Sequence, residues 1–253
     1  MELRTFTFVA PSTKSYTIRE QNGEDEDILS NPRDVSNMMN ITKFIAAIVV
    51  KTDATPSGKL TIKDSLALPL LDRYCILIQS RIFSLGETLD IPYTWPGTKE
   101  ELHYEEDLNN YVFKDYSSAP SEEELNSKPY AVPYYLEPNN LVGKVITLTS
   151  GKVISFDVLT GNSEQFLLSL PEEKKTRNSE LMARNLKLSV EGKFEKVQNF
   201  SLFSVRDMAE MRKIINTYDP VFQGLTDLEN PSNGDKIQYP VMAAPSFFYL
   251  TEA

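Results

Sequence analysis

The chain has 253 residues, of which 41% are hydrophobic, and its 36 acidic residues outnumber 26 basic ones to give a net charge of −10. General binding of nucleic acid or of an anionic membrane requires a basic face, so we expect neither partner. The longest apolar run, 44–50, is far shorter than the ~20 residues that span a bilayer.

The cysteine content and the first residues indicate a cellular compartment. Cys75 is the one cysteine, which excludes an internal disulfide and a cysteine-based zinc site. The sequence begins without the basic segment and apolar stretch of a signal peptide. These features predict a protein of a reducing cytoplasm, with one large domain or two of about 100 to 130 residues.

The first elements in chain order form a predicted β-hairpin followed by helices. Leu3–Val9 and Ser15–Arg19 alternate and are rich in Thr, Phe and Val, with a Pro-Ser-Thr-Lys turn between them. Residues 24–29 begin a short helix, because carboxylates are favourable in a first helical turn. Residues 38–50 follow as a helix with an apolar second half.

Residues 68–86 predict the central helix of a domain core. Pro69 suits a first turn and Gly86 suits a C-terminal cap. Further apolar residues widen the surface beyond one face, so this helix is expected to be covered on several sides. The stripe along one face consists of Leu68, Leu71, Cys75, Ile78, Ile82 and Leu85.

The same order of elements recurs after residue 140. Residues 145–148 and 153–158 predict a second hairpin around Ser-Gly-Lys, and residues 162–170 predict a short helix after a Gly-Asn turn. Near-equal spacing suggests duplication, although few residues are identical and chance similarity stays open. Residues 179–190 predict a helix whose end reads equally as strand and turn. Residues 204–218 form a clear helix in the place of the central helix.

Each long helix is followed by a predicted hairpin. The first comprises 88–95 and a strand from Leu102 onward, and the second comprises 220–228 and 236–242, with 246–250 as a buried terminal strand. The predicted fold class is therefore α+β, with two similar modules, each a β-hairpin, helices and a β-hairpin packed around a central helix. We place the modules at 1–116 and 141–253.

Residues 117–140 predict an acidic, proline-rich linker between the modules. It contains four prolines and the run Glu122-Glu123-Glu124. Residues 100–126 include nine carboxylates and one lysine. The interpretation as a solvated connector and the interpretation as a docking surface for a basic partner both stay open.

No pattern of residues indicates catalysis, cofactor binding or a metal site. Phosphate-binding and nucleophile-elbow motifs are missing from the sequence, and the acidic runs lack the spacing of a calcium loop. His103 is the one histidine and lies in an acidic predicted hairpin. A pair of carboxylates that meets in space cannot be found from sequence, which leaves a small enzyme as one alternative.

Seven residues are candidates for structural or partner contacts. Asp72 lies in the first turn of the central helix, where it caps the helix, forms a buried ion pair or recognises a partner. Asp207 occupies the corresponding place in the second half. The full set is Asp72, Arg73, Arg81, Trp95, Tyr134, Tyr135 and Asp207.

Four segments carry a resemblance to a known family: YTIREQNGEDEDILSN, LALPLLDRYCILIQSRIFSLGE, SVRDMAEMRKIINTYDP and a terminal Phe-Phe pair. The chain resembles the baseplate hub assembly proteins of T-even-like contractile-tailed bacteriophages. Some members carry cysteine pairs in the hairpins after the helices. This chain has Tyr93-Thr94-Trp95 there, so a metal-stabilised hairpin does not transfer.

The resemblance implies a non-enzymatic viral protein of tail morphogenesis, without cofactor or metal, that binds other phage tail or baseplate proteins. It implies a location in the host cytoplasm during assembly. A permanent place in the virion tail baseplate, or in a related contractile injection device, is the alternative. Self-association to an oligomer also stays open.

Overall fold

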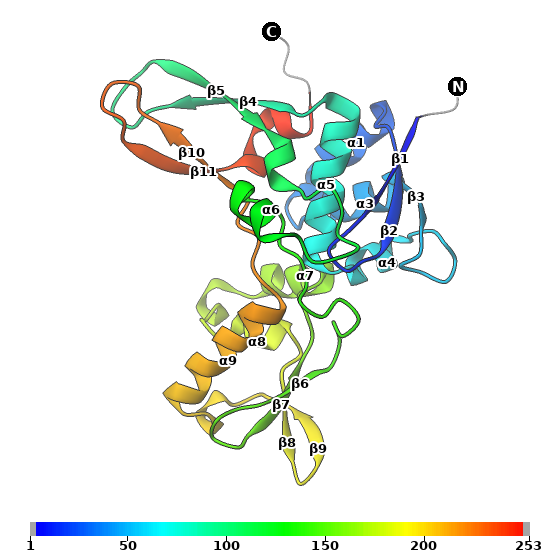
Figure 1. Ribbon diagram of the computed structural model, residues 1–253, viewed down its shortest axis with the longest axis vertical. Coiled ribbons are helices and arrows are strands. Elements are labelled where there is room, and N and C mark those ends of the chain that lie inside the picture. Colours follow the sequence, from blue (N-terminus) through cyan, green and yellow to red (C-terminus); the bar gives the residue numbers. More distant parts are fainter. Residues whose placement is uncertain (1–3, 250–253) are drawn as a thin grey trace.

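The computed structural model describes residues 4–249 and has an α+β architecture in which all strands pair antiparallel. Two hydrophobic cores divide it into lobes that follow one another along the long axis of Figure 1. We call residues 4–136 together with 222–249 the large lobe, and residues 141–218 the small lobe, of which Leu141 and Val158 pack against the first core.

The large lobe begins with a three-stranded sheet in the order β1-β2-β3, formed by β1 (Thr5–Val9), β2 (Ser15–Arg19) and β3 (Val49–Thr52). The predicted hairpin is confirmed. The helix expected over 38–50 is shorter, because the β-branched pair Val49-Val50 joins the sheet beside β2. The helices between the strands are α1 (Gly23–Ser30), α2 (Pro32–Val35) and α3 (Met39–Ile48).

The predicted central helix is α5 (Leu70–Leu85), which follows the short α4 (Ile62–Ala67). It begins two residues later than the apolar stripe because Pro69 is its N-cap, and it ends before Gly86, whose φ is +91°. Ten of its sixteen residues are buried, including charged ones, so the helix is covered on several sides as expected.

Two β-ribbons lie side by side in the large lobe (Figure 1), although one comes from the middle of the chain and the other from its end. The ribbons are β4 (Thr88–Thr94) with β5 (Glu101–Asp107), and β10 (Leu225–Glu229) with β11 (Lys236–Pro240). The Tyr93 hydroxyl donates to the Glu229 carbonyl oxygen over 2.9 Å. The Thr226 hydroxyl donates to the Glu106 carboxylate.

The C-terminal part of the chain corrects the predicted module 141–253. Leu228, Val241 and Phe247 are buried in the core of the large lobe, so the chain returns to the first core after the small lobe. The expected terminal strand is also wrong where the structure describes it: short 3₁₀ turns occupy Val241–Ala243 and Pro245–Phe247. Leu250 lies outside the described residues.

Residues 117–140 are not a solvated connector throughout. A 3₁₀ turn (Leu108–Tyr111) precedes the segment in the chain. The segment contains one short helix, α6 (Glu122–Ser127), which Ser121 caps. Ala131, Val132 and Tyr135 are buried in the core of the large lobe. The carboxylates of α6 are exposed, as are Leu125, Tyr130 and Leu136, so the segment contains both a buried and an exposed part.

The small lobe pairs a four-stranded sheet with α9 (Val205–Tyr218). The sheet has the order β6-β7-β8-β9, formed by Lys144–Thr147, Val153–Phe156, Lys187–Val190 and Lys193–Lys196. The end of the segment 179–190 is therefore a strand, β8, which confirms the strand alternative, and only its first part is a short helix. The other helical segments are α7 (Gly161–Ser169), Glu172–Lys174, α8 (Ser179–Ala183) and Phe200–Leu202.

The first hairpins of the two lobes share their turn geometry. The amide of Ala10 donates to Lys14 O over 2.9 Å, and the amide of Leu148 donates to Lys152 O over the same distance. Thr13 and Gly151 stand at the same place in the two turns and both have positive φ, 61° and 84°. The duplication itself stays a prediction, since the later elements of the lobes differ.

The lobes are joined where the start of α5 meets the start of α7. The Leu70 amide donates to Leu159 O over 2.9 Å, and the Gly161 amide donates to Leu68 O over 3.2 Å. Arg73 Nη2 lies 3.4 Å from Glu164 Oε2 across the same junction. A β-carbon on Gly161 would lie only 2.9 Å from Arg73 Nη1, so this close approach requires glycine.

Candidate functional site

Asp72 fastens the central helix to the first hairpin. Its Oδ1 accepts from the Ser12 amide over 2.9 Å, and its Oδ2 accepts from the hydroxyls of Ser12 and Tyr16. The carboxylate is fully buried without a cation in contact among residues 4–249. Burial raises its pKa to about 6 against the opposing effect of these donors. Asp72 therefore links the central helix to the hairpin inside the fold and is not on the surface.

Arg73 and Arg81 are also buried and bond within the chain. Arg73 donates to Ser65 O over 2.9 Å and pairs with Glu164 of the small lobe. Arg81 donates to Gly86 O and Thr88 O after the end of α5, over 2.6 and 3.0 Å. Burial lowers the pKa of both guanidiniums. Partner recognition by either side chain would require the core to open.

Asp207 confirms the predicted N-cap pair with Ser204, which forms a capping box at the start of α9. Its Oδ2 also lies 2.8 Å from Lys152 Nζ in the turn between β6 and β7. The hydrogen bond from Lys152 is the largest of the effects that lower the pKa of this carboxyl well below its usual range. Asp207 is thus an intramolecular anchor, like Asp72.

The three aromatic candidates lie in different environments. Tyr135 is only 2% exposed, so it cannot contact a partner in this structure. Trp95 is partly exposed in the loop between β4 and β5. Tyr134 is partly exposed and lines a hollow in the surface. The structure therefore places one of the seven candidates in a concave site.

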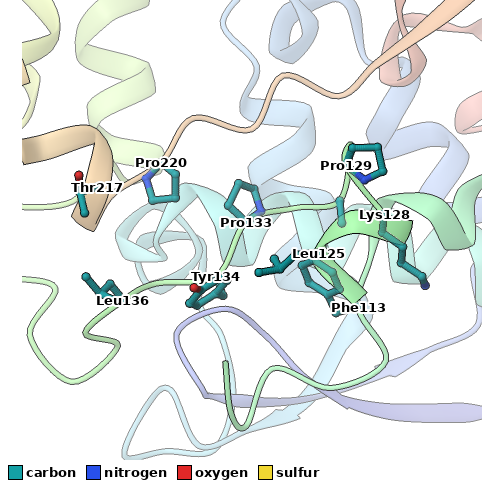
Figure 2. A pocket seen from close by; sticks show the side chains of 10 residues that line it. Phe113, Leu125, Lys128, Pro129, Pro133, Tyr134, Leu136, Thr217 and Pro220 are labelled. Carbon is teal, nitrogen blue, oxygen red and sulfur yellow. The ribbon is translucent and has the colours of Figure 1, made fainter. Parts of the chain in front are cut away.

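This hollow, which we call the proline groove, has a volume of about 330 Å³ and lies where the large lobe meets the end of α9 (Figure 2). One wall comes from residues 113–136, and the other comes from Thr217 and Pro220. Figure 2 shows the side chains of Phe113 and Leu125 next to each other in it. The remaining lining residues are Lys128, Pro129, Ala131, Pro133, Tyr134 and Leu136.

Hydrogen bonds fix the wall of the proline groove. The Val132 amide donates to Tyr111 O over 2.8 Å, and the Tyr116 hydroxyl donates to Val132 O over 2.8 Å. Lys128 Nζ donates to Asn109 O and Val112 O, over 2.7 and 2.9 Å. Together with the prolines, these bonds hold the wall in one conformation before any partner arrives, which reduces the entropy lost on binding.

The lining suits binding of an apolar segment. Lys128 is its one charged residue, and the ammonium group is already bonded to backbone carbonyls. Leu125 and Leu136 are 37% and 51% exposed, so apolar surface faces the solvent here. Sequence reasoning identified Tyr134 but missed the leucines, because only the fold shows that they line one hollow with Phe113 and Pro220.

Carboxylates are close in the chain to two residues that line the proline groove, Leu125 and Leu136. Glu122, Glu123 and Glu124 occupy the first turn of α6, and Glu137 follows Leu136. Glu137 pairs with Lys144, while the described residues provide no ion-pair partner for the α6 carboxylates. An apolar lining and unpaired carboxylates in the helix that carries Leu125 favour a partner that combines apolar and basic side chains.

No protein-family model, curated protein or solved structure shows significant similarity to this chain. Within residues 4–249, no helix is both long and apolar enough to cross a bilayer. The same residues contain no cluster of three or more histidine, cysteine or carboxylate side chains arranged to hold a metal ion.

Proposed function

We propose that this chain is a non-enzymatic protein of phage tail baseplate assembly that binds another tail protein in the proline groove. The observation that carries the proposal is a preformed, apolar groove whose lining offers binding surface and whose one charged residue is already bonded. The resemblance of four segments to baseplate hub assembly proteins supplies the biological context. The proposed place of action is the host cytoplasm during assembly.

The proposed occupant is a segment of another tail protein with bulky apolar residues next to Lys or Arg. The apolar residues would contact Phe113, Tyr134 and Leu136, and the basic ones would face the carboxylates of α6. Aromatic and proline side chains form a rigid contact surface, so the groove itself loses little conformational entropy when the segment binds.

A matched pair of leucine variants tests the groove. Leu136→Asp places a charge in the groove, whereas Leu202→Asp places the same charge on a leucine of equal exposure in the small lobe, 54% against 51%. In a pull-down from cells that express the phage hub proteins, we expect the wild type and Leu202→Asp to retain an identified hub protein. Leu136→Asp is expected to lose it. Equal retention by both variants contradicts the groove.

Deletion of the gene tests the function as a whole. We expect particles without tails, and complementation by the wild type but not by Leu136→Asp. Intact contractile tails after deletion would contradict a role in assembly.

The permanent structural component is the second candidate within the same class. Mass spectrometry of purified particles separates it from a transient assembly factor, because only a component stays in the finished tail.

The small enzyme with a carboxylate site is the alternative of another class. The carboxyls whose pKa burial raises, Asp72, Glu164 and Asp219, lie in three different places and bond to donors of the chain itself. Hydrolytic activity that disappears when two neighbouring carboxylates are substituted would favour the enzyme.

A further inference from the structure

Three of the arginines in this acidic chain line one hollow of the small lobe. The hollow has a volume of about 210 Å³ and lies between α8 and α9. We call it the arginine pocket, and its polar lining consists of Arg177, Glu180, Arg184, Arg212 and Asn216. It is distinct from the proline groove, although neighbouring residues at the end of α9 line the two.

Arg184 is already paired with two carboxylates of the chain. Its Nε and Nη2 donate to Glu180 Oε1 over 3.1 and 2.8 Å, and its Nη1 donates to Asp219. Arg184 is 1% exposed and lines the pocket. The ion pairs hold the Arg184 guanidinium in place, and its two carboxylate partners exceed its charge by one.

The charges of Arg177 and Arg212 are not balanced. Arg212 donates only to neutral oxygens, over 2.6 Å to Asn178 Oδ1 and over 3.5 Å to the Met208 carbonyl. Within residues 4–249, no carboxylate lies at ion-pair distance from either guanidinium. In total, three guanidiniums face two carboxylates at this site. The local charge is therefore positive in a chain whose net charge is −10.

We propose that the arginine pocket binds a tetrahedral oxyanion, inorganic phosphate or a phosphate ester. Guanidinium groups present planar forks of N–H donors that match phosphate oxygens and stay charged at any physiological pH. Arg177 and Arg212 can each donate to a different oxygen of one oxyanion. A tetrahedral group also offers oxygens in several directions, whereas a planar carboxylate presents only one edge. The proposal does not depend on the partner-binding function.

Titration of the full chain with inorganic phosphate, followed by calorimetry and by NMR at constant ionic strength, tests the site. We expect saturable binding that either Arg212→Gln or Arg177→Gln weakens roughly tenfold or more, since each removes a charge-assisted hydrogen bond. Arg206→Gln is the matched control, because this exposed arginine lies in the first turn of α9, outside the pocket. It is expected to change affinity less than twofold.

Parallel titrations identify the source of the oxyanion. Tighter binding of O-phosphoserine than of phosphate would assign the site to a phosphate ester, and the reverse order would assign it to the free ion. Three outcomes overturn the proposal: no saturable binding by the wild type, an equal loss in all three variants, or acetate that binds as tightly as phosphate. Thermal unfolding of each variant verifies that the small lobe is folded.

Discussion

Asp72 and Asp207 hold the same position in two helices of this chain, since each is the third residue of its helix, α5 or α9. Each carboxylate also bonds to the turn of the first hairpin in its own lobe. Asp72 accepts from Ser12, and Asp207 accepts from Lys152. One is buried among neutral donors and the other is paired with a cation. The shared placement thus produces opposite shifts of the two carboxyl pKa values.

The first prediction concerns the pH dependence of Asp72. Because its pKa rises from 3.8 to about 6 on folding, the folded state binds more protons than the unfolded state between these values. The free energy of unfolding, compared with Asp72→Asn, should therefore fall by about 2 kcal/mol as pH rises from 4 to 6. Urea unfolding of both proteins at several pH values measures this difference.

Asp207→Asn serves as the control for this measurement. The folded-state pKa of Asp207 is lowered, so its contribution is present above the ordinary pKa of 3.8 and is lost only as pH falls below it. Between pH 4 and 6, the difference in free energy of unfolding between wild type and Asp207→Asn should stay nearly constant. The difference between wild type and Asp72→Asn should change over the same range. Parallel pH curves for the two variants would contradict the assigned environments.

The second prediction concerns the junction of the lobes. Gly161→Ala should lower the free energy of unfolding by roughly 1 to 3 kcal/mol, because the new methyl group would meet Arg73 Nη1 at 2.9 Å and Leu66 O at 3.0 Å. Gly23→Ala is the matched control: Gly23 is likewise the first residue of its helix, but its β-carbon would meet nothing within 4 Å. Chemical denaturation compares them, and equal effects would contradict the close junction.

The third prediction separates two buried tyrosines, each 2% exposed. The Tyr135 hydroxyl has no hydrogen-bond partner among the described residues, whereas the Tyr116 hydroxyl donates to Val132 O over 2.8 Å. Tyr135→Phe should leave stability unchanged or raise it by about 1 kcal/mol, since it removes an unsatisfied polar group. Tyr116→Phe should lower stability by about 1 to 2 kcal/mol. The reverse order in thermal or urea unfolding would contradict this assignment.

The fourth prediction tests whether the end of the chain belongs to the large lobe. Phe247 is fully buried in the core of that lobe, whereas Phe194 in β9 is 44% exposed. Phe247→Ala should lower the free energy of unfolding by about 3 to 5 kcal/mol, and Phe194→Ala by about 0.5 kcal/mol or less. Hydrogen exchange should show the loss of protection in β1–β3 and α5. Loss confined to β6–β9 would contradict the lobe assignment.

Local patterns were sufficient to predict most helices and hairpins. The stripe of α5, the capping pair Ser204 and Asp207, and the turns around Thr13 and Gly151 depend on residues close together in the chain. The boundary between α3 and β3 was not predictable in this way, because Val49 and Val50 suit either element. Pairing with β2, thirty residues earlier, selected the strand.

The candidate site was predicted only in part. Tyr134 was identified from an aromatic and proline-rich segment, but its neighbour Tyr135 points into the core. Leu125 and Leu136 carried no signal, because isolated leucines in a polar stretch are common on protein surfaces. The arginine pocket gave none either, since Arg177 and Arg212 are separated by more than thirty residues.

The sequence by itself determined the α+β class, the central helix and the hairpins, because periodicity and turn residues act over a few positions. Only the tertiary structure decided that residues 225–247 return to the first core and that buried carboxylates bond to distant turns. These contacts join residues far apart in the chain, and the free energy of burial depends on which surfaces meet, not on the order in which they are synthesised.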